Sequence, residues 1–326
     1  MTRCNVIVDN RIKVVPLACL ASRRVCVALI ALSLLSGQEA HPSSHRVFTH
    51  LLDIETSATW REVPRWDGSL LVGFINSQSA GSIIYTINSE GQRDEILFTL
   101  KEAGYVSVID AAASAKGEIA AVGSALGGER ATSYVARIAT NRTSQVVTRV
   151  WPYCPMVVTF ASDGIIWTIG HIKDDGDTRI TANHVLRRFD AAGKLLTSAI
   201  LDVPGNSTDE ISYLRSSSDR VAWFTRSGEY IEFALNGTEI NRYAGPSGVA
   251  ERDISGVAVS PANQVVIGTM VNGKGQFLVL DRQSREWVPV SVAPEFTAGW
   301  VRVLGFEGSS LVTTNGNGRL RRFSTK

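Results

Sequence analysis

The 326-residue sequence predicts an all-β fold, a six-bladed β-propeller of four-stranded antiparallel blades, and three observations support this prediction. The first is composition: 28 glycines stand against 10 prolines and 3 methionines, and β-branched and aromatic residues occur throughout. Such a composition favours short strands joined by turns over helices. The second is a repeated strand-and-turn pattern, and the third is the strand character of the two ends of the chain.

The repeat consists of two series of short apolar segments that advance together. "IIWTIGHI", which follows the Asp163-Gly164 turn, is typical of the first series. That series starts at Ser69, Glu118, Ile165, Arg220, Gln264 and Ser309, at spacings of 49, 47, 55, 44 and 45 residues. The second starts at Ser82, Tyr134, His184, Tyr230, Phe277 and Arg319. Self-similarity at this period indicates one repeated supersecondary unit. An open β-solenoid is the alternative, but its repeats are usually shorter.

Each unit reads as four strands with tight glycine-containing turns, which makes an antiparallel meander. The predicted blades span residues 57–101, 105–151, 155–203, 209–244, 252–293 and 300–326. The sixth lacks a fourth strand, and residues 45–55 have strand character, so we expect the N-terminal strand to complete the last blade. Closing the ring in this way leaves only short, protected sheet edges.

Residues 1–40 are predicted to be a signal peptide or N-terminal export segment. Arg23 and Arg24 precede the apolar run Val25–Leu35, and small residues follow it, which is the order of a secretory signal. We therefore expect an exported protein, periplasmic or extracellular, with residues 41–326 as one domain and no membrane span in the mature chain. An uncleaved segment that anchors the protein is the alternative.

Removal of this segment leaves a nearly neutral chain with one cysteine. The segment holds five of the 33 basic and two of the 31 acidic residues, which leaves 28 against 29. A neutral balance argues against a nucleic-acid partner, because nucleic-acid binders carry a clustered basic face. Cys154 alone remains, so no internal disulfide can form. We interpret Cys154 as a buried inert thiol, with a nucleophile as the alternative. We expect the protein to be a monomer.

On this pattern, including the motif "SDGIIW" (Ser162 to Trp167), the chain resembles the six-bladed β-propeller superfamily. The resemblance covers residues 45–326 and lies in the neighbourhood of NHL-repeat and gluconolactonase-like proteins. Propellers of the WD and kelch types fit less well, because their recurring dipeptides are missing.

The candidate site is expected where the innermost strands begin, because the connections on that side are longer and chemically richer, and loops on rigid scaffolds carry function. The predicted channel-mouth residues are Trp60, Arg61, Tyr105, Tyr153, Asp209, Glu210, Arg252, Asp253, Trp300 and Arg302. Aromatic rings, arginines and carboxylates around one concavity suit a small polar ligand or a protein segment. The alternative is that these are structural residues of the channel.

Two functions remain open at this point. The first is a ligand-binding, protein-binding or scaffold module, which needs no special residues. The second is a metal-dependent hydrolase, which the gluconolactonase-like resemblance implies, with Glu210 and Asp253 as the first candidates for holding a divalent cation at the channel mouth. No motif supports a cofactor, and no catalytic residue is assigned. Asp174, Asp175 and Asp177 could offer oxygen ligands to calcium, or they form a solvated acidic loop.

Overall fold

The computed structural model describes residues 46–55, 64–76, 81–101, 103–127, 130–174, 179–203, 212–225, 227–250, 253–315 and 319–325. All of them belong to one unit, His45–Lys326. The predicted export segment, residues 1–40, lies outside the described residues. Within the described ranges, no helix is long and apolar enough to cross a membrane.

The described elements are β-strands and one short 3-10 helix, η3 (Pro294–Phe296). Four sheets are antiparallel meanders of four consecutive strands. One contains β6 (Tyr105–Ala113), β7 (Ile119–Gly127), β8 (Arg130–Ile138) and β9 (Gln145–Arg149), and the next contains β10 (Tyr153–Phe160), β11 (Ile166–Lys173), β12 (Ile180–Phe189) and β13 (Leu195–Ile200). The others contain β14 (Tyr213–Ser216), β15 (Arg220–Phe224), β16 (Tyr230–Ala234) and β17 (Glu239–Tyr243), then β18 (Ile254–Val259), β19 (Val265–Val271), β20 (Lys274–Asp281) and β21 (Glu286–Pro289).

The remaining strands form one eight-stranded sheet in the order β1-β24-β23-β22-β2-β3-β4-β5. Its strands are β1 (Thr49–Glu55), β2 (Arg65–Asp67), β3 (Leu70–Asn76), β4 (Ser82–Ile87), β5 (Arg93–Phe98), β22 (Arg302–Glu307), β23 (Ser310–Thr314) and β24 (Arg319–Ser324). Two antiparallel runs of four strands meet where β2 and β22 pair in parallel, at Trp66 and Gly305 alone.

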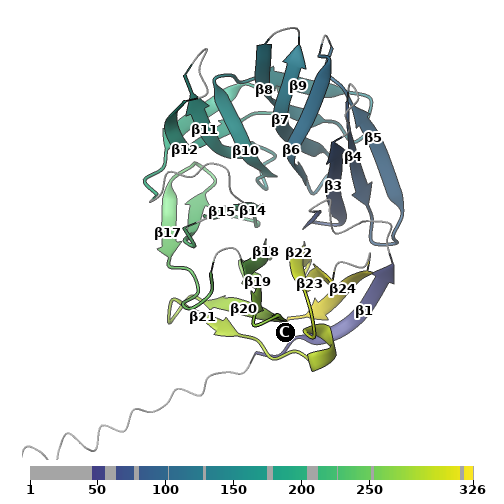
Figure 1. Ribbon diagram of the computed structural model, residues 1–326, viewed down its shortest axis with the longest axis vertical. Helices are drawn as coiled ribbons and strands as arrows, with labels where there is room; N and C mark the ends of the chain where they lie inside the picture. Colours follow the sequence, from purple (N-terminus) through teal and green to yellow (C-terminus); the bar gives the residue numbers. More distant parts are fainter. Residues whose placement is uncertain are drawn as a thin grey trace, which may run out of the picture. The chain divides into compact units, whose positions relative to one another are not determined.

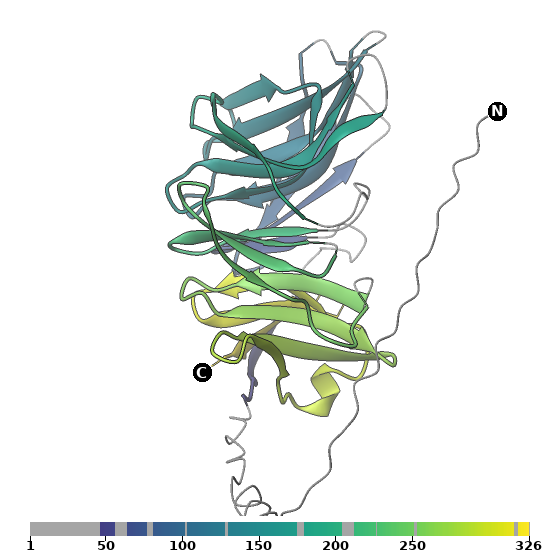
Figure 2. The ribbon, with the colours of Figure 1, turned by 90° about the vertical axis from the view of Figure 1, so that its left-hand side faces the viewer.

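The sheets are arranged around a central axis, and the first strand of each meander lies nearest to it (Figure 1). Seen from the side, the teal, green and yellow sheets lie one above another (Figure 2). This all-β arrangement of antiparallel four-stranded meanders is a β-propeller, as the repeat predicts.

The predicted pairing of the two ends of the described unit is confirmed. β1 pairs antiparallel with β24, with Asp53 opposite Arg321. Phe48, just before β1, is buried against the ring of Phe277, at 6.0 Å between centroids. The N-terminal segment therefore contributes ladder hydrogen bonds to the last sheet and apolar packing against the sheet that contains β20.

Two glycines allow the innermost strands to approach one another closely. A Cβ atom added to Gly305 would lie 1.9 Å from the carbonyl oxygen of Trp66, and one added to Gly256 would lie 2.0 Å from that of Val303. Real side chains do not tolerate such contacts, so only glycine fits at these positions. These two positions therefore set the spacing of β22 from β2 and from β18.

Candidate functional site

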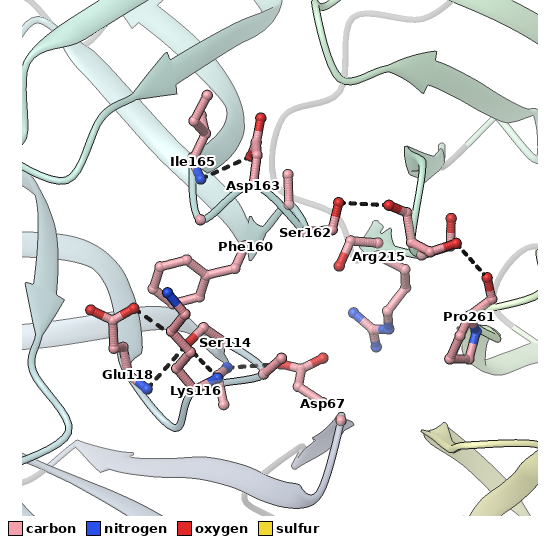
Figure 3. Close-up of a pocket in the computed structure, with 18 of the residues that line it drawn as sticks. Asp67, Ser114, Lys116, Glu118, Phe160, Ser162, Asp163, Ile165, Arg215 and Pro261 are labelled. Atoms are coloured by element: carbon pink, nitrogen blue, oxygen red, sulfur yellow. Dashed lines mark hydrogen bonds between the residues drawn. The ribbon is translucent and has the colours of Figure 1, made fainter.

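A cavity of about 590 Å³ lies where the innermost strands end and turn into their neighbours. Its rim contains the turns that follow β2, β6, β10, β14, β18 and β22, so every repeat contributes to it (Figure 3). Glycines in these turns, such as Gly117 and Gly164, have positive φ angles of 82° and 81°. Tight turns of this kind bring the backbone close to the axis at this end of the channel.

Beside the cavity-lining residues Trp66 and Asp67 lies Arg65 of β2, whose side chain reaches other repeats. Arg65 is only 3 % exposed. Its Nη1 donates to the carbonyl of Val158 at 2.7 Å, and its Nη2 donates to the hydroxyl of Thr159 and the carbonyl of Leu214, both at 3.2 Å. One guanidinium thus joins β2 to β10 and β14.

Two carboxylates balance this cation. Asp67 lies 2.8 Å from Nε of Arg65 and accepts a hydrogen bond from the backbone N–H of Ala113. Asp110 lies 3.7 Å from Nη1 of Arg65 and accepts a hydrogen bond from the N–H of Val158 at 2.8 Å. Burial raises the pKa of Asp110, although the Arg65 charge and the Val158 N–H act in the opposite direction.

Arg215 of β14 supplies a second cation, which faces the cavity. It is 9 % exposed, and its Nε and Nη1 donate to the carbonyls of Val257 and Leu214 at 2.9 and 3.0 Å. Burial and the charge of Arg65 lower the pKa of Arg215 to about 10, so it remains charged at neutral pH. Its Nη2 has no hydrogen-bond partner among the described residues and is not a buried atom. Because Arg215 lines the cavity, this free donor is available to a ligand.

The rim is fastened by side chains that reach from one turn to the next. Ser162 donates to the carbonyl of Ser218, and Ser218 donates to the carbonyl of Pro261, both at 2.7 Å. On the other side, Arg137 forms an ion pair with Glu118 at 2.8 Å and donates to the carbonyl of Gly164 at 3.2 Å. Successive repeats are therefore tied together around the mouth, which gives the cavity a defined shape.

Five of the ten predicted channel-mouth residues are described. Tyr105 and Tyr153 begin β6 and β10, Asp253 precedes β18, Trp300 precedes β22, and Arg302 begins β22. Trp60, Arg61, Asp209, Glu210 and Arg252 lie outside the described residues. The cavity lining contains none of the ten, because it is formed at the opposite ends of the innermost strands. A site where these strands begin remains a prediction.

The structure brings two of the predicted residues together and buries a third. The guanidinium of Arg302 lies 4.9 Å from the ring centroid of Trp300, and burial lowers the pKa of Arg302. Tyr153 is fully buried, with its hydroxyl 2.8 Å from that of Thr168. Burial raises the pKa of Tyr153 well above its usual range. We assign Tyr153 to the packing of its blade.

The carboxylates considered as metal ligands from the sequence do not gather among the described residues. Asp174 forms an ion pair with Arg179, whereas Asp175 and Asp177 lie outside the described residues. Within the described ranges, no group of three His, Cys, Asp or Glu side chains is placed to hold a metal ion. Cys154 is buried, and its sulfur lies 3.4 Å from the hydroxyl of Ser133.

The sequence prediction missed Arg215, which lines the cavity, and the neighbouring charged residues Arg65 and Asp110. Each of the three lies on an innermost strand, and Asp110 interrupts the largely apolar β6, so a charged residue at such a position is a signal that could have indicated them. Such a charge is costly unless it is paired, so its presence indicates a buried network or a binding site.

No known protein family matches this chain, and no curated protein matches it. Among solved structures, it is similar to virginiamycin B lyase from Staphylococcus aureus, with 13% sequence identity and a TM-score of 0.44. The similarity covers 85% of this chain and 99% of the lyase chain. The activity in that name belongs to the staphylococcal protein, and a likeness of this degree carries no argument about the site of this chain.

Proposed function

We propose that this chain is an exported, ligand-binding β-propeller of six four-stranded blades, with its ligand site in the central cavity at the turn end of the channel. Six blades follow if the eight-stranded sheet counts as two, since its two runs of four strands share only the pairing of Trp66 with Gly305. The order of basic, apolar and small residues before position 41 supports export.

The observation that carries the ligand-binding proposal is the fixed, charged side chain of Arg215 with a free donor in a concave site. Pockets for small molecules typically measure about 300 to 1,000 Å³ and hold a few converging polar groups among apolar walls. The volume of about 590 Å³ falls in this range. Phe160 and Phe306 contribute apolar lining, and Arg215 and Asp67 contribute charged groups.

A thermal-shift screen of sugars, organic acids, amino acids and nucleosides tests this proposal on the full-length chain. The matched variants are Ala115→Trp and Ala262→Trp, both at exposed positions in turns after innermost strands. Ala115 lines the cavity and Ala262 does not. We expect a compound that raises the melting temperature of the wild type and of Ala262→Trp but not of Ala115→Trp. If every stabilising compound acts equally on both variants, the cavity is not the ligand site.

A further inference from the structure

We propose that the central cavity takes a small zwitterion of the α-amino acid class, with its carboxylate on Nη2 of Arg215 and its ammonium on the carboxylate of Asp67. This inference rests on the proposed function, because it names the chemistry of the ligand for the same cavity. Figure 3 shows both side chains projecting into the cavity, one from β14 and the other from the end of β2.

Arg215 is prepared to bind a carboxylate without rearranging. Its Nε and Nη1 are already held by the carbonyls of Val257 and Leu214, which fix the plane of the guanidinium. Neither partner is a carboxylate, and Arg215 forms no ion pair with any described residue. The positive charge therefore lacks an anion in direct contact while its Nη2 reaches the cavity. A ligand carboxylate at this nitrogen would supply a charge-assisted hydrogen bond.

Asp67 offers the complementary group. Its Oδ2 is used by Nε of Arg65 and by the N–H of Ala113. Its Oδ1 has no hydrogen-bond partner among the described residues and is not a buried atom, so it also reaches the cavity. A free carboxylate oxygen held in one orientation is an acceptor for an ammonium group.

The two groups line the same cavity without pairing with each other, which leaves both open to a ligand that carries both charges. Arg215 and Asp67 are not an ion pair, because none of their nitrogen and oxygen atoms lie within 4.0 Å of one another. They are nevertheless close enough that the charge of Asp67 raises the pKa of Arg215 against the effect of burial. An α-amino acid places its ammonium and carboxylate on one carbon, so it can fill such a gap and pair both.

A ligand with a single charge would pair less well with Arg215 and Asp67. An anion on Arg215 would lie near the free oxygen of Asp67, and a cation on Asp67 would lie near Arg215, and like charges in a partly dehydrated site repel strongly. A zwitterion adds no net charge, and it would pair with Arg215 and with the free Oδ1 of Asp67. Phe160, Leu196 and Phe306 in the lining favour an apolar side chain on the amino acid.

Isothermal titration calorimetry on the full-length chain tests the proposal with three probes: L-leucine, N-acetyl-L-leucine and L-leucinamide. The second lacks the ammonium and the third lacks the carboxylate, while the side chain is unchanged. We expect L-leucine to bind at least about tenfold more tightly than either derivative. Equal binding of L-leucine and one derivative, or no binding of L-leucine, would overturn the proposal.

Variants then test which charged group of the ligand pairs with Asp67 and which pairs with Arg215. Asp67→Asn should weaken L-leucine about tenfold and leave N-acetyl-L-leucine unchanged, and Arg215→Met should weaken L-leucine but not L-leucinamide. Asp94→Asn, in the outer strand β5, is the control with no expected effect. If Arg215→Met does not fold, the three probes with the wild type still decide the question. L-Leucine binding that is insensitive to Asp67→Asn would also contradict the proposal.

The outcomes separate this inference from the proposed function. If L-leucine fails but another class of compound in the thermal-shift screen is blocked by Ala115→Trp, the cavity is a ligand site and only the amino-acid assignment is wrong. If no compound is blocked by Ala115→Trp, both proposals fail.

Discussion

The guanidinium of Arg65 donates to the carbonyl of Val158 at 2.7 Å, although 93 residues separate them in the chain. The same group reaches Leu214, 149 residues away. A single side chain therefore ties the first repeat to the third and the fourth across the axis. Among the described residues, the innermost strands pair with each other at one point, between β2 and β22, and the Arg65 contacts help to explain how they hold a fixed arrangement.

Replacing Arg65 with methionine should destabilise the protein by about 3 kcal/mol, because it removes the buried cation that pairs with the partly buried carboxylates of Asp67 and Asp110 and its hydrogen bonds to other repeats. Urea denaturation of the wild type and the variant measures the difference. Arg179→Met is the matched control: its side chain is 73% exposed, and its ion pair with Asp174 should contribute less than about 1 kcal/mol. Equal losses in the two variants would show that the Arg65 network does not hold the ring together.

The N-terminal strand should be needed for a stable ring. A chain of residues 56–326 lacks β1 and the buried ring of Phe48, and it exposes the edge of β24. We expect its melting temperature to fall by about 5–10 °C relative to residues 41–326, since each kcal/mol lost shifts the midpoint by about 2–4 °C at this size. Differential scanning calorimetry on both chains makes the comparison. Identical midpoints would mean that β1 contributes nothing to closure.

The close approach of the innermost strands predicts a strong penalty for a single methyl group. Gly256→Ala and Gly305→Ala would each place a Cβ atom at or below 2.0 Å from a backbone carbonyl oxygen, so we expect losses of at least about 1–3 kcal/mol in urea denaturation. Gly299→Ala is the control, because nothing lies within 4 Å of its Cβ position. A loss at Gly299 as large as at the other two would point to backbone freedom and not to strand spacing.

The sequence predicted the strands because the turns repeat, and it predicted closure because residues near position 50 have strand character. It could not predict the contacts of Arg65 and Arg215, since both donate to backbone carbonyls that belong to other repeats. Such partners depend on how the strands are brought around the axis, and no local pattern encodes this. The sequence prediction placed the site among the longer loops, where the innermost strands begin. The cavity instead lies among short turns, where serines such as Ser162 and Ser218 donate to neighbouring turns.

Glu232 should give the protein a defined loss of stability in acid. Its fully buried carboxylate binds Arg220 at 3.0 Å and Arg282 at 2.5 Å, and it accepts a hydrogen bond from Asn241. Burial alone would raise the pKa of Glu232, but the hydrogen bonds from Arg282 and Asn241 and the charges of both arginines lower it below its usual value. A lowered folded-state pKa contributes stability that is fully present above the unfolded value, about 4.3, and is lost as the pH falls through the folded value.

Urea denaturation of the wild type and of Glu232→Gln between about pH 3 and pH 7 checks this contribution, since the glutamine keeps the size of the side chain and removes its titration. We expect the wild type to be more stable by about 3–5 kcal/mol at neutral pH, because the variant leaves Arg220 and Arg282 without their buried anion. The difference should narrow as the pH falls below about 4, where Glu232 becomes protonated in the unfolded chain and then in the folded one. A difference that stays constant over the whole range would mean that the two arginines do not depend on the charge of Glu232.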